Sequence, residues 1–221
     1  KRVITAYELK MANANFGAAE LATDERLRCL EPKWINGDDR LNALPIVTPS
    51  KLSSRMAETL KSGIQLVVYT GGNLNVADAK AIFDSCHDAL GSPKPLEPLP
   101  PLGRCVQLNP GRASRSAYCR NPTDENCAVD MYWQIGTDDG SKVSGKLALL
   151  EHIMYESLFD TLRTKQQLGY SVSCSARNTQ GVLGFLISIT SHSHSVSDIE
   201  DRALTFVKTW LSTTLKTMPD A

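Results

Sequence analysis

Residues 142–190 read KVSGKLALLEHIMYESLFDTLRTKQQLGYSVSCSARNTQGVLGFLISIT, and this stretch decides the fold. Apolar residues recur at helical spacing over 142–163, which predicts one long amphipathic helix. Strand-forming residues then predict two strands, 170–175 and 182–190, joined by a polar turn that ends at Gly181. The stretch is therefore expected to form a helix followed by a β-hairpin.

The flanking sequence extends this pattern to an α+β domain. Upstream, residues 104–108, 114–120 and 126–135 predict three more strands, separated by turns that contain Pro. Downstream, Ser197-Asp-Ile-Glu200 reads as a capping box that opens a last helix. Three strands, a helix, two strands and a helix favour a mixed or antiparallel sheet with helices packed on one face.

The first 92 residues predict a helix-rich segment. Helices are expected over Ala6–Phe16, from Thr23, from Thr48 to about residue 63, and from Asn75 to about residue 90. The run Ile64–Thr70 is rich in strand formers and predicts a buried strand. Several apolar helix residues are expected to face inward: Leu52, Met56, Leu60, Ala79, Ile82 and Phe83.

A proline cluster divides the chain. Five of the eleven prolines fall within residues 92–102, where neither a helix nor a central strand can form. We therefore predict an interdomain linker over 93–103, with one segment before it (1–92) and one after it (104–221). Because the chain begins at Lys1 without a Met, it is expected to be processed or cut from a longer protein.

Composition excludes several function classes. The chain has 24 Lys and Arg against 24 Asp and Glu, a balance that argues against nucleic-acid binding and against a membrane-surface protein. It also contains no apolar run of the roughly 20 residues that a membrane helix needs. Six cysteines without a C-x-x-C pair favour free thiols in a reducing compartment, the cytoplasm, with the mitochondrion left open. The alternative is a disulfide between Cys119 and Cys127.

Two patterns invite a metal and neither completes a site. His192-x-His194 supplies a pair of imidazoles without an evident third ligand. Ala148-Leu-Leu-Glu151-His152 differs by one residue from the zinc motif H-x-x-E-H, but an alanine methyl cannot bind zinc. We therefore predict no metal ligand and no general base in this segment. An independent metal hydrolase built from these residues is the weakest of the alternatives.

The junction between the long helix and the hairpin carries the strongest candidate site. Arg163 offers a fork of donors, Tyr170 offers a phenolic hydroxyl, and Gly169 permits an unusual backbone angle between them. Both side chains are expected to point into one cleft. Taken alone, these residues also fit a surface arginine and a packed tyrosine.

The segment LRTKQQLGY, residues 162–170, strongly resembles the signature in the last domain of the insulinase/pitrilysin family, the insulin-degrading-enzyme-like zinc metallopeptidases. The next hairpin, SARNTQGVLG at 175–184, and the strand CAVDMYWQ at 127–134 are similar to elements of the same domain. Upstream, Gly72-Asn73 falls where the family ends a strand in Gly-Asn. The resemblance covers nearly the whole chain.

The resemblance implies α/β-roll domains, four in a clamshell, with zinc held by H-x-x-E-H in the N-terminal half. It implies that 1–92 ends the third, non-catalytic domain and that 104–221 begins the fourth. Arg163 and Tyr170 match the family residues that reach the substrate, with Gln167, Leu168 and Gly169 as the supporting loop. Zinc is then a cofactor of the parent metalloendopeptidase only, and this segment alone is expected to be inactive.

The implied partners are peptide substrates small enough to enter an enclosed chamber and the N-terminal catalytic half of the same protein. A homodimer is left open. The alternative is a non-catalytic assembly or binding subunit that derives from the same peptidase fold.

Overall fold

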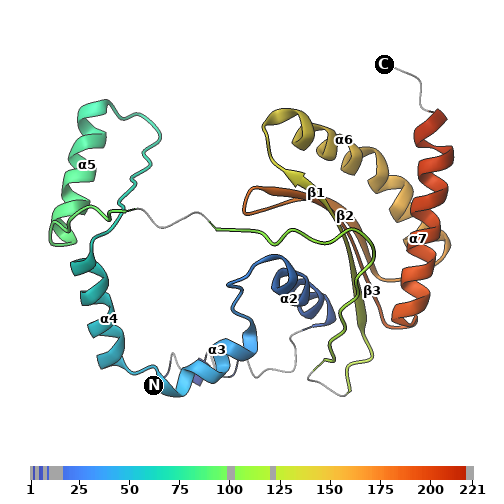
Figure 1. Cartoon of the computed structure of the whole chain (residues 1–221), viewed down its shortest axis with the longest axis horizontal. Coiled ribbons are helices and arrows are strands. Elements are labelled where there is room, and N and C mark those ends of the chain that lie inside the picture. The colour runs from blue at the N-terminus through green and yellow to red at the C-terminus, as the bar shows by residue number, and fades with distance from the viewer. Residues whose placement is uncertain are drawn as a thin grey trace. The chain divides into compact units, whose positions relative to one another are not determined.

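The computed structural model describes residues 2, 5, 6, 9, 17–98, 103–119 and 123–217. The chain divides into two compact units, which are described separately. The sheet unit comprises Lys1–Leu41 with Gly103–Ala221, and the helical unit comprises Asn42–Leu102. Figure 1 shows the elements of each.

The sheet unit is built on a three-stranded antiparallel sheet. Its strands are β1 (Cys127–Thr137), β2 (Ser171–Thr179) and β3 (Val182–Ser191), in the order β1-β3-β2. Gln180 and Gly181 join β2 to β3, both with positive φ (53° and 81°). Two such residues give the turn geometry that matches strand twist in a tight hairpin.

Two helices cover the apolar face of this sheet (Figure 1): α6 (Ser141–Leu158) and α7 (Val196–Thr213). A π-helix, η2 (Phe159–Lys165), continues α6, and a short 3-10 turn, η3 (Leu215–Thr217), follows α7. The resulting core is continuous and includes Met131, Met154, Leu158, Leu162, Leu168, Val172, Cys174, Phe185, Ile187, Ile189, Ile199, Ala203, Phe206 and Trp210. The predicted α+β class is therefore confirmed.

A further helix, α2 (Ala18–Leu30), packs on the opposite face of the sheet (Figure 1). Side chains alternate along a strand, so Asp130 points away from the core that its neighbour Met131 enters. The Asp130 carboxylate pairs with the Arg26 guanidinium of α2 at 2.9 Å and accepts a hydrogen bond from the Ser188 hydroxyl at 2.7 Å. This nearly buried ion pair fixes α2 to the sheet.

The helical unit holds η1 (Leu44–Ile46), α4 (Pro49–Ser62) and α5 (Val76–Ala89), and α3 (Gly37–Ala43) reaches its start. Both predicted N-caps are found. Thr48 accepts from the Lys51 amide at 3.2 Å, and Asn75 forms a reciprocal capping box with Asp78. The helices are therefore specified locally by their first turns.

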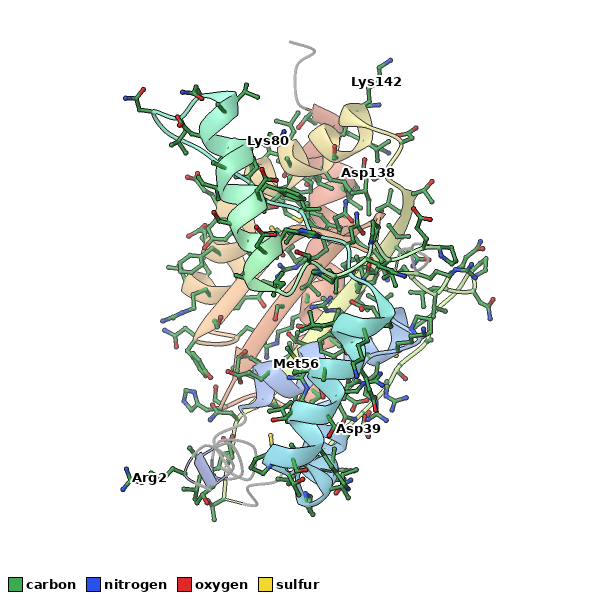
Figure 2. All side chains as sticks on the ribbon, turned by 90° about the vertical axis from the view of Figure 1, so that its left-hand side faces the viewer. Arg2, Asp39, Met56, Lys80, Asp138 and Lys142 are labelled. Carbon is green, nitrogen blue, oxygen red and sulfur yellow. The ribbon has the colours of Figure 1, made fainter. Side chains whose placement is uncertain are left out.

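The predicted core of the helical unit is wrong for this chain. Residues Ile64–Thr70 form no strand beyond one bridge from Ile64 to Pro95, and Tyr69 is 96% exposed. The apolar residues expected to face inward are instead largely exposed, among them Met56, which is labelled in Figure 2. The periodicity found amphipathic helices correctly, but the described residues provide no surface that covers their apolar sides.

Two of the three expected upstream strands are also wrong. Residues 104–108 and 114–119 join no β-ladder among the described residues, and residue 120 lies outside them. The Val106 amide instead donates to the Leu30 carbonyl at the end of α2, and the Leu108 amide donates to the Gln134 side chain. An amide side chain and a helix end thus satisfy backbone groups that the sequence assigned to a sheet.

Smaller differences concern the ends of elements. The long helix was expected to run to 163, but its last turn is η2, and β2 extends four residues beyond the expected 175. The α7 cap is Ser195, which accepts from the Asp198 amide, rather than Ser197. The expected helix Ala6–Phe16 and the end of the expected linker fall largely outside the described residues.

Contacts place α2 with the sheet, whereas the predicted boundary grouped all of 1–92 together. The assignment of 1–92 and 104–221 to successive domains of a longer protein stays a prediction. Among the described helices, none is long and apolar enough to cross a membrane.

Candidate functional site

The candidate site lies where η2 leads into β2. Two buried leucines fix this turn to the core: Leu162 and Leu168 have no exposed surface, and the Leu168 amide donates to the Leu162 carbonyl at 2.8 Å. The Gln166 amide donates to the carbonyl of Thr161, five residues earlier, as expected in a π-helix. π-helical turns are rare and are frequently found at functional sites.

Gly169 is required for a different reason from the one predicted. Its φ is not in the left-handed region; Gln167 adopts that angle instead, with φ of 50°. A Cβ at position 169 would overlap the Thr190 carbonyl oxygen and come within 3.1 Å of its carbonyl carbon. Glycine is therefore needed because the turn packs directly against the backbone of β3.

The structure brings Arg163 and Tyr170 together through the backbone. The Arg163 Nε donates to the Tyr170 carbonyl at 3.2 Å, which closes the turn across seven residues. The Tyr170 side chain is 54% exposed, and its ring centroid lies 6.5 Å from that of His192. The turn thus holds the tyrosine backbone rigidly and presents its phenol to solvent.

That the side chains of Arg163 and Tyr170 point into one cleft stays a prediction. A concavity of about 640 Å³ lies on α6, but Arg163 and Tyr170 do not line it. Its lining residues are Ala148, Glu151, His152, Ile153, Tyr155, Glu156 and Ser157. Arg163 is half-buried, whereas Tyr170 is exposed.

The chain is similar in sequence to several known proteins. The chain is 30% identical over 204 residues to a nardilysin-like protein of Arabidopsis thaliana, which covers 89% of this chain. It is 32% identical to human nardilysin over 83% of its length and 32% identical to human insulin-degrading enzyme over 75%. Residues 149–221 match the family model described as PQQ synthase PqqF-like, C-terminal lobe domain 4. The chain belongs to the insulinase family.

The fold agrees with this assignment. The crystal structure of pitrilysin superposes on 99% of this chain with a TM-score of 0.66, at 21% identity. The chain covers only 16–19% of the length of these curated relatives and 23% of that pitrilysin chain. It therefore corresponds to one portion of an insulinase-family protein. The family model that residues 149–221 match describes a domain of the C-terminal lobe.

The residues of this portion do not fit the zinc of the family. In the near-motif on α6, the Glu151 carboxylate accepts a hydrogen bond from the Ala176 amide at 2.8 Å. His152 is exposed to solvent. The first ligand position is Ala148. Within the described ranges, no three His, Cys, Asp or Glu side chains are placed to hold a metal ion. The carboxylate of the near-motif thus binds the backbone of the edge strand β2.

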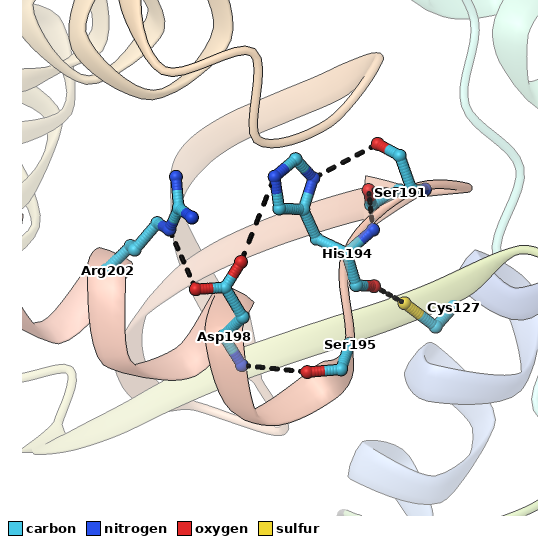
Figure 3. Close-up of polar contacts among 7 residues, drawn as sticks. Cys127, Ser191, His194, Ser195, Asp198 and Arg202 are labelled. Atoms are coloured by element: carbon cyan, nitrogen blue, oxygen red, sulfur yellow. Dashed lines mark hydrogen bonds and ion pairs between the residues drawn. The ribbon is translucent and has the colours of Figure 1, made fainter.

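The two imidazoles of the His192-x-His194 pair have different contacts. His194 lies 3.8 Å from the Asp198 carboxylate, beside which Figure 3 draws it, and 3.0 Å from the Ser193 hydroxyl. Asp198 in turn accepts from the Arg202 guanidinium at 2.8 Å. His192 is exposed and its ring faces Tyr170 instead. The two histidines therefore do not converge on a common ligand position.

All six cysteines are free thiols, so the alternative disulfide between Cys119 and Cys127 is not formed. The Cys127 Sγ donates to the His194 carbonyl at 2.9 Å (Figure 3). Burial, together with the smaller effect of the nearby Glu151 carboxylate, raises the pKa of the Cys174 thiol to about 11. Every cysteine whose pKa is shifted has a raised pKa: Cys105, Cys119, Cys127 and Cys174. A nucleophilic cysteine instead needs a lowered pKa.

Sequence reasoning missed two features of the insulinase-family portion. It considered His192 only as one of a metal pair, which it rejected, and did not connect this residue with Tyr170, because spacing alone does not reveal the sheet register that brings the two rings together. It also missed the Arg26–Asp130 pair on the second face of the sheet. The signal for that pair was present, since an acid between Val129 and Met131 in an apolar strand requires a cation or donor opposite it.

Proposed function

We propose that this chain is part of the zinc-free C-terminal half of an insulinase-family zinc metalloendopeptidase, where it positions peptide substrates and stabilises the transition state. The zinc and the general base belong to an N-terminal half that carries H-x-x-E-H. The two halves enclose a chamber, so the substrates are short polypeptides. Six free thiols favour a reducing compartment, and we propose the cytoplasm.

The observation that carries the proposal is the construction of the 163–170 turn. Two fully buried leucines, a glycine packed on the β3 backbone and the Arg163–Tyr170 hydrogen bond fix the turn, yet leave the Tyr170 phenol exposed. A preorganised donor of this kind costs no reorganisation when charge develops on a substrate oxygen. Exclusion of water by the closing half would strengthen its hydrogen bond.

Arg163 has two tasks in this proposal. Its Nε already holds the Tyr170 carbonyl, so its terminal amino groups are the part that can donate to a peptide carbonyl. Gln167, Leu168 and Gly169 act as the supporting loop. The proposed contacts with substrate are hydrogen bonds, in keeping with a segment of zero net charge.

The test is Tyr170→Phe in the full-length protein, with peptide cleavage as the readout. Removal of one oxyanion donor is expected to lower kcat by roughly 10- to 1,000-fold with little change in KM. Tyr118→Phe is the matched control, because Tyr118 is 95% exposed elsewhere in the sheet unit. An unchanged kcat for Tyr170→Phe would contradict the role of the phenol.

The second candidate function is a non-catalytic assembly or binding subunit. It is consistent with the same observation as the first candidate, that the described residues offer no fitting metal site. Zinc content and chelator-sensitive peptide cleavage of the full-length protein separate the two, because only the peptidase requires both. Chelator-sensitive cleavage by residues 1–221 alone would contradict both candidates.

A further inference from the structure

The register of the hairpin brings His192 beside Tyr170. Ser171 at the start of β2 pairs with Thr190 near the end of β3. Tyr170 immediately precedes the first of these residues, and His192 follows the second by two positions. Their ring centroids are 6.5 Å apart and the ring planes are inclined by 34°. This distance is within the range of aromatic pairs that attract one another.

Hydrogen bonds of the residues next to His192 brace the loop that carries it, and Figure 3 shows those at Ser191 and His194. Ser191 has no exposed surface, and its hydroxyl accepts from the amides of Ser193 and His194, each at 3.2 Å. The His194 carbonyl accepts from the Cys127 thiol, and the His194 ring lies beside Asp198. The backbone on both sides of His192 is therefore fixed to β1 and α7.

The His192 side chain itself takes no part in this bracing. Within residues 17–98, 103–119 and 123–217, its one recorded interaction is the ring contact with Tyr170. A half-exposed tyrosine otherwise samples several rotamers, which costs entropy when one of them is required. A ring held by a rigid loop removes some of these rotamers.

We propose that His192 is a positioning residue that orients the Tyr170 phenol toward the substrate. Arg163 and Gly169 fix the tyrosine backbone, and His192 restricts the ring, so together they determine where the hydroxyl lies. This inference rests on the proposed function of Tyr170. It assigns His192 no contact with the reacting atoms, so its effect has to pass through Tyr170.

The experiment is a double-mutant cycle in the full-length protein with a peptide substrate. His192→Ala is expected to lower kcat by about 2- to 10-fold, the range of an aromatic pair, and to leave KM unchanged. In the Tyr170→Phe background, the same substitution is expected to have no further effect on kcat, because the hydroxyl it orients is already absent.

Two variants separate the ring from its polar atoms. His192→Phe keeps the ring contact and is expected to retain kcat, whereas His192→Asn keeps a polar group without the ring and is expected to behave as His192→Ala. His152→Ala is the matched control, because His152 is exposed on α6 and does not contact Tyr170. Melting temperatures of all variants establish that the fold is retained.

The outcomes are distinguishable. If Tyr170→Phe lowers kcat but His192→Ala does not, the positioning role is wrong and the proposed function stands. A fall in kcat that persists in the Tyr170→Phe background, or a change confined to KM, also overturns the positioning role. If Tyr170→Phe itself has no effect, the proposed function and this inference both fail.

Discussion

The two units of the chain contain the same kinds of helix, yet they differ in what covers them. In the sheet unit, α6 and α7 place their apolar residues in one core with the sheet, and Met154 is 2% exposed. In the helical unit, Gly63 is the single buried residue between 42 and 98, and Met56 is 56% exposed. Amphipathic sequence therefore specifies a helix, but packing requires an opposing surface.

The difference has a functional counterpart. The residues proposed to act on substrate lie in the sheet unit, where buried side chains fix the turn that carries them. The helical unit depends on local capping hydrogen bonds at Thr48 and Asn75. Preorganisation of a donor requires the first kind of support, since an exposed helix end frays.

The largest expected effect is a matched pair of methionine truncations in residues 1–221. Met154→Ala is expected to lower the free energy of unfolding by about 2–5 kcal/mol, because it leaves a cavity in a closed core. Met56→Ala should cost less than about 0.5 kcal/mol, as for other exposed positions. Urea denaturation followed by circular dichroism measures both.

The same pair tests the predicted domain assignment. If residues 1–92 complete a larger domain in the full-length protein, Met56→Ala there is expected to cost as much as Met154→Ala. Equal, small effects of Met56→Ala in both contexts would show that its helix face stays uncovered.

The next effect is thiol reactivity. Cys86 on α5 is exposed, whereas Cys174 on β2 is buried with its pKa raised to about 11. Because Cys174 is buried and its raised pKa keeps the thiol protonated at neutral pH, the exposed Cys86 is expected to react at least about 100-fold faster. Timed alkylation at pH 7.5 with peptide mass mapping gives both rates.

A raised pKa also sets the sign of a pH effect. The folded state keeps the Cys174 thiol protonated, whereas the unfolded chain can lose that proton at a lower pH. The contribution of Cys174 to the free energy of unfolding is therefore complete below the pKa of the unfolded thiol. It is lost as the pH rises toward 11. Rapid labelling of Cys174 in the folded chain would contradict a closed core behind β2.

The same contrast explains what sequence could predict. Periodicity found α6, α7 and the β2–β3 hairpin, because their apolar patterns meet one another in the core. It failed at Ile64–Thr70, at 104–108 and at 114–120, where the strand-forming residues that the structure describes have no partner strand within the described part of the chain. Arg163 and Tyr170 were identified from a local signature. Their link to His192 depends on strand register, which no local pattern encodes.

A smaller effect is expected from glycine substitutions that test how tightly the turn of the candidate site is packed. Gly169→Ala is expected to cost about 1–3 kcal/mol of stability, because the added methyl overlaps the Thr190 carbonyl. Gly145→Ala, inside α6 with open space around it, is expected to gain about 0.5–1 kcal/mol. Denaturation midpoints measure both, and a neutral Gly169→Ala would show that the turn is loosely held.

The smallest effect compares two helix caps, one from each unit. Ser195 caps α7 and Asn75 caps α5, and each accepts a hydrogen bond from the amide three residues later. Replacement of either by Ala removes about 1 kcal/mol from its helix. In α7 this loss is shared with the core, so Ser195→Ala is expected to lower the unfolding free energy of the whole sheet unit by that amount.

In α5 the loss stays local, because a 14-residue helix with an exposed apolar side is marginally stable by itself. Asn75→Ala is therefore expected to speed amide hydrogen exchange at residues 76–80 about fivefold, while exchange in β3 stays unchanged. Exchange measured by mass spectrometry on the two variants distinguishes a local from a global response. If Asn75→Ala also accelerated exchange in β3, the two units would unfold together and the contrast between them would be wrong.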